Sequence, residues 1–442
     1  MPMSVAPRRL AATVIALAAA LGALTGCSGS KLGFHAKASG PPVTLHVAVY
    51  GTPGYSQAGL YSNYEVLHPG AHIVEQNLGQ EQAYWQQLRR QLTTGSTGAD
   101  LIAIPVADIA TAIHQFAGKL VPLNTLGGAA GGVNTFTDNW APWLSQPAQQ
   151  HGTYYAIAAE TGPLALCYRP ILLREASLPS TPAQLSKAWS TWQGYLSYGR
   201  TFHHRISHGP AFMDSVTSMY NAMVSQSPTQ YYSATGKLAV AGNPAVKKAW
   251  SAATMAAKEG LSAKLTPLTT AWDTGVQRLQ FATAICAPWM LNRIQHDSGK
   301  SEPDSWGVTT IPGGTGNWGG FYLAIPRTSQ HQQDAYQLAQ YLTDQQSGPA
   351  VARTGGFPAS SPAINAAARV TNAYFSTSPT GSIFGTAADR VPAAPTGPAQ
   401  STISAAFDQA LSAVETGKSA SSSAWASALT QAKRAYGAGK RA

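Results

Sequence analysis

The 442-residue sequence has few charged residues, and acidic residues are scarcer than basic ones. Asp, Glu, Lys and Arg together make up 11% of the chain, whereas hydrophobic residues make up 44%. Intrinsically disordered proteins show the opposite balance, so this composition excludes a disordered chain. Because single hydrophobic cores stop growing at about 250 to 300 residues, we expect a chain of this length to form two lobes.

The sequence also lacks short motifs that mark common enzyme classes. It contains no GxxxxGK[ST] phosphate loop, no HExxH zinc motif and no GxSxG nucleophile turn. Gly314, Gly316 and Gly319 do satisfy GxGxxG. They precede an expected strand, however, whereas a dinucleotide-binding loop follows a strand and opens a helix. We therefore expect neither an enzyme nor a bound cofactor.

The excess of basic residues does not indicate a nucleic-acid partner. Lys and Arg number 29 against 19 Asp and Glu, which gives a net charge of +10. No stretch packs four or more basic residues together as a phosphate-binding patch would, so we expect a basic, solvated surface. His203, His204 and His208 lie close together, and the last two have metal-ligand spacing on a helix. Gly209 and Pro210 follow so closely that we expect a solvated loop there and no metal site.

The first residues resemble an export signal. Arg8 and Arg9 precede an apolar stretch from Leu10 to Leu24. This stretch has about 15 residues and is shorter than the ~20 that span a bilayer. Leu24 to Cys27 (LTGC) resembles a bacterial lipoprotein signal, the alternative being a plain secretory signal with a chance Cys. We expect a signal peptide over residues 1–26, a lipid on Cys27 that anchors the protein to the cell membrane, and a flexible tether over 27–42.

Strand and helix patterns alternate from Val43 onward. Strands are expected at 44–50, 71–76 and 100–104, with helices at 57–67, 80–94 and 106–116. A second alternating block contains strands at 154–158, 165–168, 282–287, 307–311 and 321–325, with helices at 182–197, 213–225, 243–259, 333–343, 403–416 and 423–436. Residues 376–401 are expected to be an extended crossing. The alternation predicts an α/β fold, with a mostly parallel sheet for the strands of the first block.

Several stretches resemble, in order along the chain, the extracellular solute-binding proteins of sugar-importing ABC transporters, the group that includes maltodextrin-binding proteins. The matching stretches are Tyr61 to Val74, Thr93 to Ile102, Gly118 to Leu123, Gly152 to Tyr168, Ala282 to Ile294, Gly307 to Pro326 and Thr354 to Ser360. The resemblance implies a two-lobed periplasmic-binding-protein-like fold of type II with a ligand cleft between the lobes. It places lobe I at 43–158 and 320–355, and lobe II at 159–319 and 356–442.

The resemblance also implies a function outside the cytoplasm. The protein would capture a small-molecule solute, a sugar or oligosaccharide, and deliver it to the permease subunits of an ABC transporter. Two alternatives remain open from the sequence. An exported glycoside hydrolase needs two carboxyl groups flanking a cleft, for which Glu160 with Asp214 or Asp273 is the available pairing. A receptor for a non-sugar solute, such as a phosphodiester or a metal, is the other.

Candidate ligand-binding residues follow from the rule that ligands of open α/β sheets lie beyond the carboxyl ends of strands. Sugar rings stack on aromatic side chains, and sugar hydroxyls need charged or amide partners. The residues selected in this way are Tyr50, Gly51, Gln80, Glu160, Trp272, Asp273, Trp289 and Trp318. The candidate set also includes Asp214, from the carboxyl pairing of the hydrolase alternative, and Gly319, which follows Trp318. Trp289 and Trp318 are the principal stacking candidates.

Two cysteines remain besides Cys27. Cys167 and Cys286 both lie in expected strands of lobe II, and an exported protein meets an oxidising environment. A disulfide and a pair of buried free thiols both fit the sequence.

Overall fold

Strand β1 (Val43–Val49) lies within a five-stranded sheet of the computed structural model, which describes residues 42–127, 132–299 and 303–440. Leu45, Val47 and Val49 of this strand are fully buried. The strand order is β2 (Ala71–Asn77), β1, β3 (Leu101–Pro105), β11 (Asn317–Ala324) and β6 (Ala156–Pro163). Strand β1 pairs in parallel with β2 and β3, whereas β11 runs antiparallel to β3 and β6.

A second sheet has four strands in the order β10 (Gly307–Thr310), β7 (Ala165–Tyr168), β9 (Phe281–Cys286) and β8 (Ala211–Met213). Only the β8–β9 pair of this sheet is parallel. The parallel pairing expected for the first alternating block is found among β1, β2 and β3, but both sheets also contain antiparallel pairs. Every pair that involves β6, β7, β10 or β11 is antiparallel, although helices lie between these strands and their partners in the chain. A short hairpin of β4 (Gln149–Gln150) and β5 (Thr153–Tyr154) stands apart.

Helices in the first part of the chain, and in the segment after β11, pack with the five-stranded sheet. They are α1 (Leu60–Leu67), α2 (Glu81–Thr94), α3 (Ile109–Phe116), α4 (Asn134–Thr137), α5 (Pro142–Ser145), α13 (Gln332–Leu342) and α14 (Ser347–Arg353). Short 3-10 turns join them at η1 (Val106–Asp108), η2 (Ala117–Lys119), η3 (Leu123–Thr125) and η5 (Gln146–Ala148).

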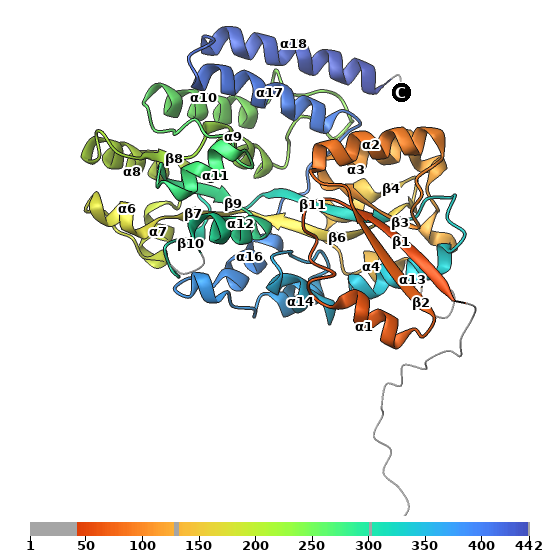
Figure 1. Ribbon diagram of the computed structural model, residues 1–442. Coiled ribbons are helices and arrows are strands. Elements are labelled where there is room, and N and C mark those ends of the chain that lie inside the picture. Colours follow the sequence, from red (N-terminus) through yellow and green to blue (C-terminus); the bar gives the residue numbers. More distant parts are fainter. Residues whose placement is uncertain (1–41, 128–131, 300–302, 441–442) are drawn as a thin grey trace, which may run out of the picture. The chain divides into compact units, whose positions relative to one another are not determined.

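The remaining helices surround the four-stranded sheet, and α17 and α18 run side by side near the C-terminus, in blue in Figure 1. These helices are α6 (Pro170–Glu175), α7 (Pro182–Ala188), α8 (Trp192–Arg205), α9 (Val216–Ser225), α10 (Pro244–Lys258), α11 (Thr270–Gln277), α12 (Pro288–Ser298), α15 (Ser361–Ala367), α16 (Thr380–Ala388), α17 (Gln400–Glu415) and α18 (Ser421–Gly439), with a 3-10 turn η6 (Ala373–Phe375).

Three local expectations are corrected. The helix expected at 182–197 is two helices, because Thr181 caps α7 and Thr191 accepts a hydrogen bond from the Gly194 amide to start α8 anew. The crossing expected at 376–401 contains helix α16. The loop expected around the three histidines is wrong for His203 and His204, since α8 continues through both.

The buried side chains form separate cores. One core joins residues between Leu45 and Ala159 to residues between Phe321 and Ala359, around the five-stranded sheet. Two further clusters surround the four-stranded sheet and draw on residues from Leu164 to Ala432. A separate core region around each sheet is what we expect of a chain too long for a single core.

Strands β6 and β11 connect the two parts of the structure, and their backbones approach very closely. A Cβ atom on Gly162 would lie 1.8 Å from the carbonyl oxygen of Trp318, and one on Gly320 would lie 2.2 Å from the carbonyl oxygen of Glu160. Gly320 also has a φ of +93°, which other residues rarely adopt. Glycine is therefore required at both positions where the strands pass.

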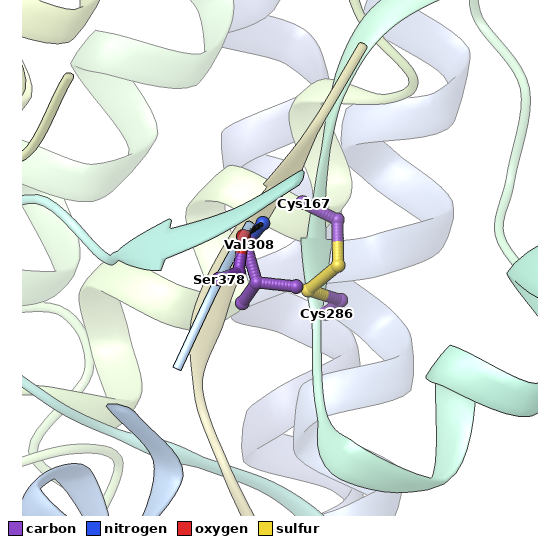
Figure 2. The surroundings of a disulfide bond; sticks show 4 residues. All are labelled: Cys167, Cys286, Val308 and Ser378. Carbon is purple, nitrogen blue, oxygen red and sulfur yellow. Dashed lines mark hydrogen bonds between the residues drawn. A yellow bond between two sulfur atoms is a disulfide. The ribbon is translucent and has the colours of Figure 1, made fainter. Parts of the chain in front are cut away.

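Cys167 on β7 and Cys286 on β9 form a disulfide between neighbouring strands (Figure 2). Both residues are fully buried in the second part of the structure. Beside them, the Ser378 hydroxyl accepts a hydrogen bond from the Val308 amide at 2.8 Å. Of the two states that fit the sequence, the structure has the bridged one.

The expected signal peptide, Cys27 and nearly all of the expected tether lie outside the described residues. Within the described ranges, no helix has both the length and the apolar character needed to cross a bilayer.

Candidate ligand-binding site

A cavity of about 410 Å³ lies between elements that belong to the two cores. The first core supplies Glu81 at the start of α2 and Trp143 on α5. The second supplies residues of α9 and α17 and the loop 391–396 that leads to α17. Trp318, at the start of β11, completes the wall. A volume of this size is within the range of small-molecule sites, about 300 to 1,000 Å³.

Three large aromatic side chains line this cavity. Trp143 and Trp318 are half-buried, and Tyr231 is buried against Phe407, with ring centroids 5.6 Å apart and planes nearly parallel. Trp318 is held from behind by Trp289, whose Nε1 donates to the Trp318 carbonyl oxygen at 3.0 Å. The two indole rings meet edge to face with centroids 5.4 Å apart. The wall thus presents fixed aromatic surfaces to whatever enters the cavity.

Polar atoms on the same wall lack partners. Trp143 Nε1, Ser218 Oγ and Gln400 Oε1 are buried and make no hydrogen bond within the described part of the chain. A buried polar group without a partner costs about 1 to 3 kcal/mol, so native structures seldom keep several close together without a reason. These atoms are covered by their neighbours, so a polar ligand or water would supply the missing partners only with a small movement of the wall.

Two carboxyl groups complete the wall. Burial, and the nearby Asp108 carboxylate, raise the pKa of Glu81 to about 7. Burial also raises the pKa of Asp408, on α17, to about 7, although Asn221 Nδ2 donates to one of its oxygens at 2.8 Å. Each carboxyl therefore lies in surroundings that disfavour its charge when the cavity holds no cation.

The family profile of the bacterial extracellular solute-binding proteins matches residues 60–375 of the chain. The chain belongs to this family. A solved structure described as an extracellular solute-binding protein of family 1 is 32% identical, with a TM-score of 0.79, and the match covers 89% of this chain and 100% of that one. The expected assignment to extracellular solute-binding proteins is confirmed. A comparison with curated protein sequences finds no match.

More distant solved structures show the same fold. The sugar-binding protein MalE of Xanthomonas citri is 18% identical with a TM-score of 0.70, and the match covers 90% of this solute-binding protein and 98% of MalE. The galacto-N-biose-/lacto-N-biose I-binding protein of Bifidobacterium longum is 15% identical with a TM-score of 0.73, covering 91% and 99%. The expected two-lobed α/β fold is confirmed. The family and these neighbours are binding proteins and not enzymes.

Of the residues predicted to bind ligand, Trp318 and Gly319 line the cavity of this solute-binding protein. Trp289 lies directly behind them. Gln80 immediately precedes Glu81 of the wall and is the N-cap residue of α2. Gly51 lies in the turn after β1, where its amide donates to the Gly79 carbonyl oxygen at 2.8 Å.

Tyr50 and Glu160 lie where β1, β6 and β11 meet. The Tyr50 hydroxyl donates to the Gly320 carbonyl oxygen at 3.0 Å, and its ring packs on Tyr84. Glu160, on β6, is buried, and burial raises the pKa of its carboxyl well above the ordinary value. Both residues belong to the region where the strands cross, and the cavity wall does not include them.

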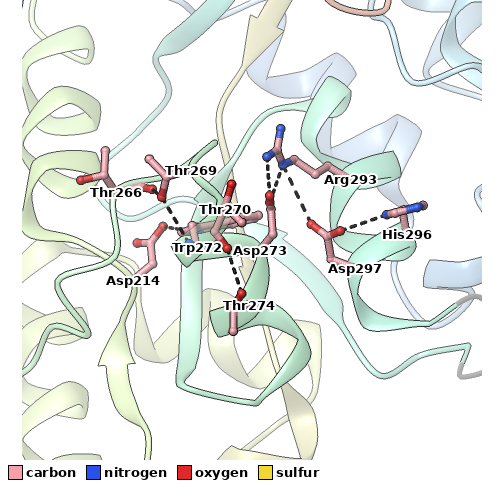
Figure 3. A network of polar contacts seen from close by, with 10 residues as sticks. All are labelled: Asp214, Thr266, Thr269, Thr270, Trp272, Asp273, Thr274, Arg293, His296 and Asp297. Atoms are coloured by element: carbon pink, nitrogen blue, oxygen red, sulfur yellow. Dashed lines mark hydrogen bonds and ion pairs between the residues drawn. The ribbon is translucent and has the colours of Figure 1, made fainter.

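Asp214, Trp272 and Asp273 lie in a separate polar network (Figure 3). Trp272 is fully buried, and its Nε1 donates to Asp214 Oδ2 at 3.0 Å. Arg293 donates to both oxygens of Asp273, at 2.6 and 2.7 Å. These carboxyl groups are thus occupied by neighbours of their own, and the cavity wall includes none of the three residues. The pairing of Glu160 with Asp214 or Asp273 that a glycosidase would use is not found at the cavity.

Sequence reasoning missed several wall residues, namely Glu81, Trp143, Asn221, Gln400 and Asp408. Only Glu81 lies where the sequence indicates a ligand-binding position, since it follows Gln80 at the end of a strand–helix turn. The others lie in helices or in a stretch without clear periodicity, and distant parts of the chain bring them together. Within the described residues, no group of three or more His, Cys, Asp or Glu side chains is arranged to hold a metal ion.

Proposed function

We propose that this solute-binding protein is the receptor subunit of an ABC importer and captures a sugar or oligosaccharide outside the cytoplasm. The observation that carries the proposal is the cavity wall, which combines the aromatic faces of Trp143 and Trp318 with buried, unpaired polar atoms. Sugars offer an apolar ring face to the former and hydroxyl groups to the latter. The sugar-binding neighbours MalE and the lacto-N-biose I-binding protein support the same ligand class.

The proposal includes closure of two lobes around the ligand. We assign residues 43–158 and 320–355 to lobe I, and 159–319 and 356–442 to lobe II. Because the wall draws on both cores, a bound sugar would bridge the lobes and favour the closed state over the open one. The crossing strands β6 and β11, which meet at Gly162 and Gly320, are the connection about which such closure would occur.

We further propose that Cys27 carries a lipid that holds the receptor at the membrane, close to the permease subunits it serves. Leu24 to Cys27 is the motif that supports this anchor. We expect Cys27→Ala to release the protein from the membrane fraction or to stall removal of the signal peptide. Unchanged membrane retention of this variant would count against the anchor.

The binding proposal is tested by calorimetry with a panel of mono- and oligosaccharides. We expect at least one to bind, and Trp318→Ala to weaken that binding by about 1 to 3 kcal/mol through loss of an aromatic anchor. Trp425→Ala is a matched control, because Trp425 packs on Trp250 between α10 and α18. If both variants keep wild-type affinity, Trp318 is not a stacking platform.

The proposal treats the chain as a receptor that releases its ligand intact. Incubation of the protein with the tightest-binding oligosaccharide should leave the ligand uncleaved, as chromatography of the mixture would show. Shortened products that persist after repeated purification would favour the glycoside hydrolase alternative.

A further inference from the structure

The cavity differs in charge from the rest of the protein. The chain as a whole carries a net charge of +10, with 29 basic residues. Among the described residues that line the cavity, the only charged side chains are two carboxyls, Glu81 and Asp408, and none is Lys, Arg or His. A cavity lined in this way repels anions, however basic the outer surface is.

The two carboxyl groups come from different sides. Glu81 opens α2, whose Trp85 and Leu88 are buried in the core of the five-stranded sheet. Asp408 lies on α17, whose Phe407 is buried in a core of the four-stranded sheet. A ligand in the cavity therefore lies between elements that each bring a carboxyl group.

Two independent features of the wall fit a cation as well. The aromatic faces of Trp143 and Trp318 attract a cationic group through their ring quadrupoles. Gln400 Oε1 is a buried acceptor without a partner in the described part of the chain, and an ammonium group has three N–H donors and no acceptor.

We propose that the ligand of this cavity is a saccharide bearing a protonated amine, that is, an amino sugar whose amino group is free and not acetylated. The inference rests on the proposed sugar-binding function and specifies its ligand class. The ammonium group would lie near the carboxyl of Glu81 or of Asp408, and the sugar ring would stack on Trp318.

The titration of the two carboxyls supports this choice. The pKa of each is raised to about 7, so near neutrality each is partly protonated when no cation is present. A bound ammonium would favour the ionised form of the carboxyl beside it and lower the pKa of that carboxyl. The affinity of an amino sugar should therefore fall as the pH drops below 7. The other titratable groups facing Glu81 are Asp108 and Tyr50, those facing Asp408 are Tyr220 and Tyr231, and Arg89 acts on Asp108.

A matched ligand pair tests the inference in full-length protein. N,N′-diacetylchitobiose and its fully deacetylated form share one disaccharide skeleton and differ in the charge of their nitrogen groups. We expect calorimetry at pH 7.5 to show at least tenfold tighter binding of the deacetylated form. Glu81→Gln and Asp408→Asn should each reduce that preference severalfold, whereas the exposed matched controls Glu175→Gln and Asp389→Asn should leave it unchanged.

The outcomes separate the two proposals. Equal or tighter binding of N,N′-diacetylchitobiose, unaffected by Glu81→Gln and Asp408→Asn, overturns the amine inference and leaves sugar capture standing. Binding of a linear polyamine such as spermidine, without binding of either disaccharide or of a neutral oligosaccharide panel, overturns sugar capture and keeps the cation site. A protein that binds none of these compounds contradicts both.

Discussion

Two groups of carboxyl side chains in this solute-binding protein have opposite surroundings. The inner network consists of Asp214, Ser215, Ser262, Trp272 and Glu415, and the cavity wall carries Glu81 and Asp408. In the inner network, Glu415 accepts hydrogen bonds from Ser262 Oγ at 2.5 Å, from the Val216 amide at 2.8 Å and from Ser215 Oγ at 3.2 Å. Asp214 accepts from Trp272 Nε1 and from the Ser215 amide.

The cavity wall has fewer donors for its acids. Asn221 donates to Asp408 and the Tyr50 hydroxyl acts on Glu81, and the wall also contains neutral polar atoms that are themselves unpaired. The difference teaches how to distinguish two kinds of buried acid. An acid surrounded by donors from its own chain holds elements together, whereas an acid beside unpaired groups in a cavity is available to a ligand.

The inner network also explains how α17 is attached. Glu415 ends α17, and its carboxyl accepts from the first amide of α9, where the helix dipole favours a negative charge. The network thus joins the C-terminal helices to the four-stranded sheet, and α17 in turn carries Asp408 and Gln400 to the cavity.

The largest expected effect comes from removing the fully buried ring of the inner network. Trp272→Ala should lower the free energy of unfolding by about 3 to 5 kcal/mol, because it leaves a cavity and an unpaired carboxyl oxygen on Asp214. Ligand affinity of the folded variant should hardly change. Denaturant unfolding and calorimetry on the same variant check both values, and the reverse pattern would place Trp272 at the ligand.

Glu415→Gln should have a smaller effect on stability, about 1 to 3 kcal/mol. The substitution keeps the size of the side chain but replaces one acceptor oxygen by a donor group, so one hydroxyl or amide of the network loses its partner. Asp408→Asn is the matched comparison on the same helix, and we expect it to alter affinity more than unfolding. If both variants unfold at the wild-type denaturant concentration, the inner network does not stabilise the fold.

The pH dependence of stability provides a third test. Burial raises the pKa of Asp214 to about 8, above its ordinary value of 3.8. The folded state therefore binds more protons than the unfolded state between these values, and this residue makes stability fall as the pH rises from about 4 to 8. The slope is at most about 1.4 kcal/mol per pH unit. Asp214→Asn should flatten it, as unfolding measured at several pH values would show, and an unchanged slope would contradict this origin.

The smallest effect is expected at Trp289, the residue behind the cavity wall. Trp289→Phe keeps a ring against Trp318 but removes the hydrogen bond to its carbonyl oxygen. We expect the binding free energy to weaken by about 0.5 to 1.5 kcal/mol, less than for Trp318→Ala, because Trp318 keeps its ring and loses only one hydrogen bond that holds its backbone. A loss as large as that of Trp318→Ala would indicate that Trp289 contacts the ligand itself.

The order of strands and helices was largely predictable from the sequence. The apolar, β-branched run expected as a strand at 44–50 and the three- and four-residue spacing at Trp85, Leu88 and Leu92 are local signals, and each corresponds to an element of the structure. The parallel pairing of β1, β2 and β3 was predictable, whereas the antiparallel pairs of β11 were not, because strand direction depends on how the chain returns and not on the pattern within a strand. The sequence does not decide between a disulfide and free thiols at Cys167 and Cys286, because two cysteines 119 residues apart carry no information on their separation in space.

The sequence by itself determined the fold class, the family and the place of Trp318 at the start of an expected crossing strand. Each of these depends on a local pattern or on motifs that keep their order along the chain. Only the tertiary structure decided which polar residues share one cavity. Glu81 and Asp408 lie more than 300 positions apart in the chain, and Asp408 does not differ locally from an ordinary helix residue. Packing of α2 and α17 against separate cores brings both carboxyls to the cavity. Burial there raises the pKa of each, and no basic side chain among the described wall residues counteracts this effect.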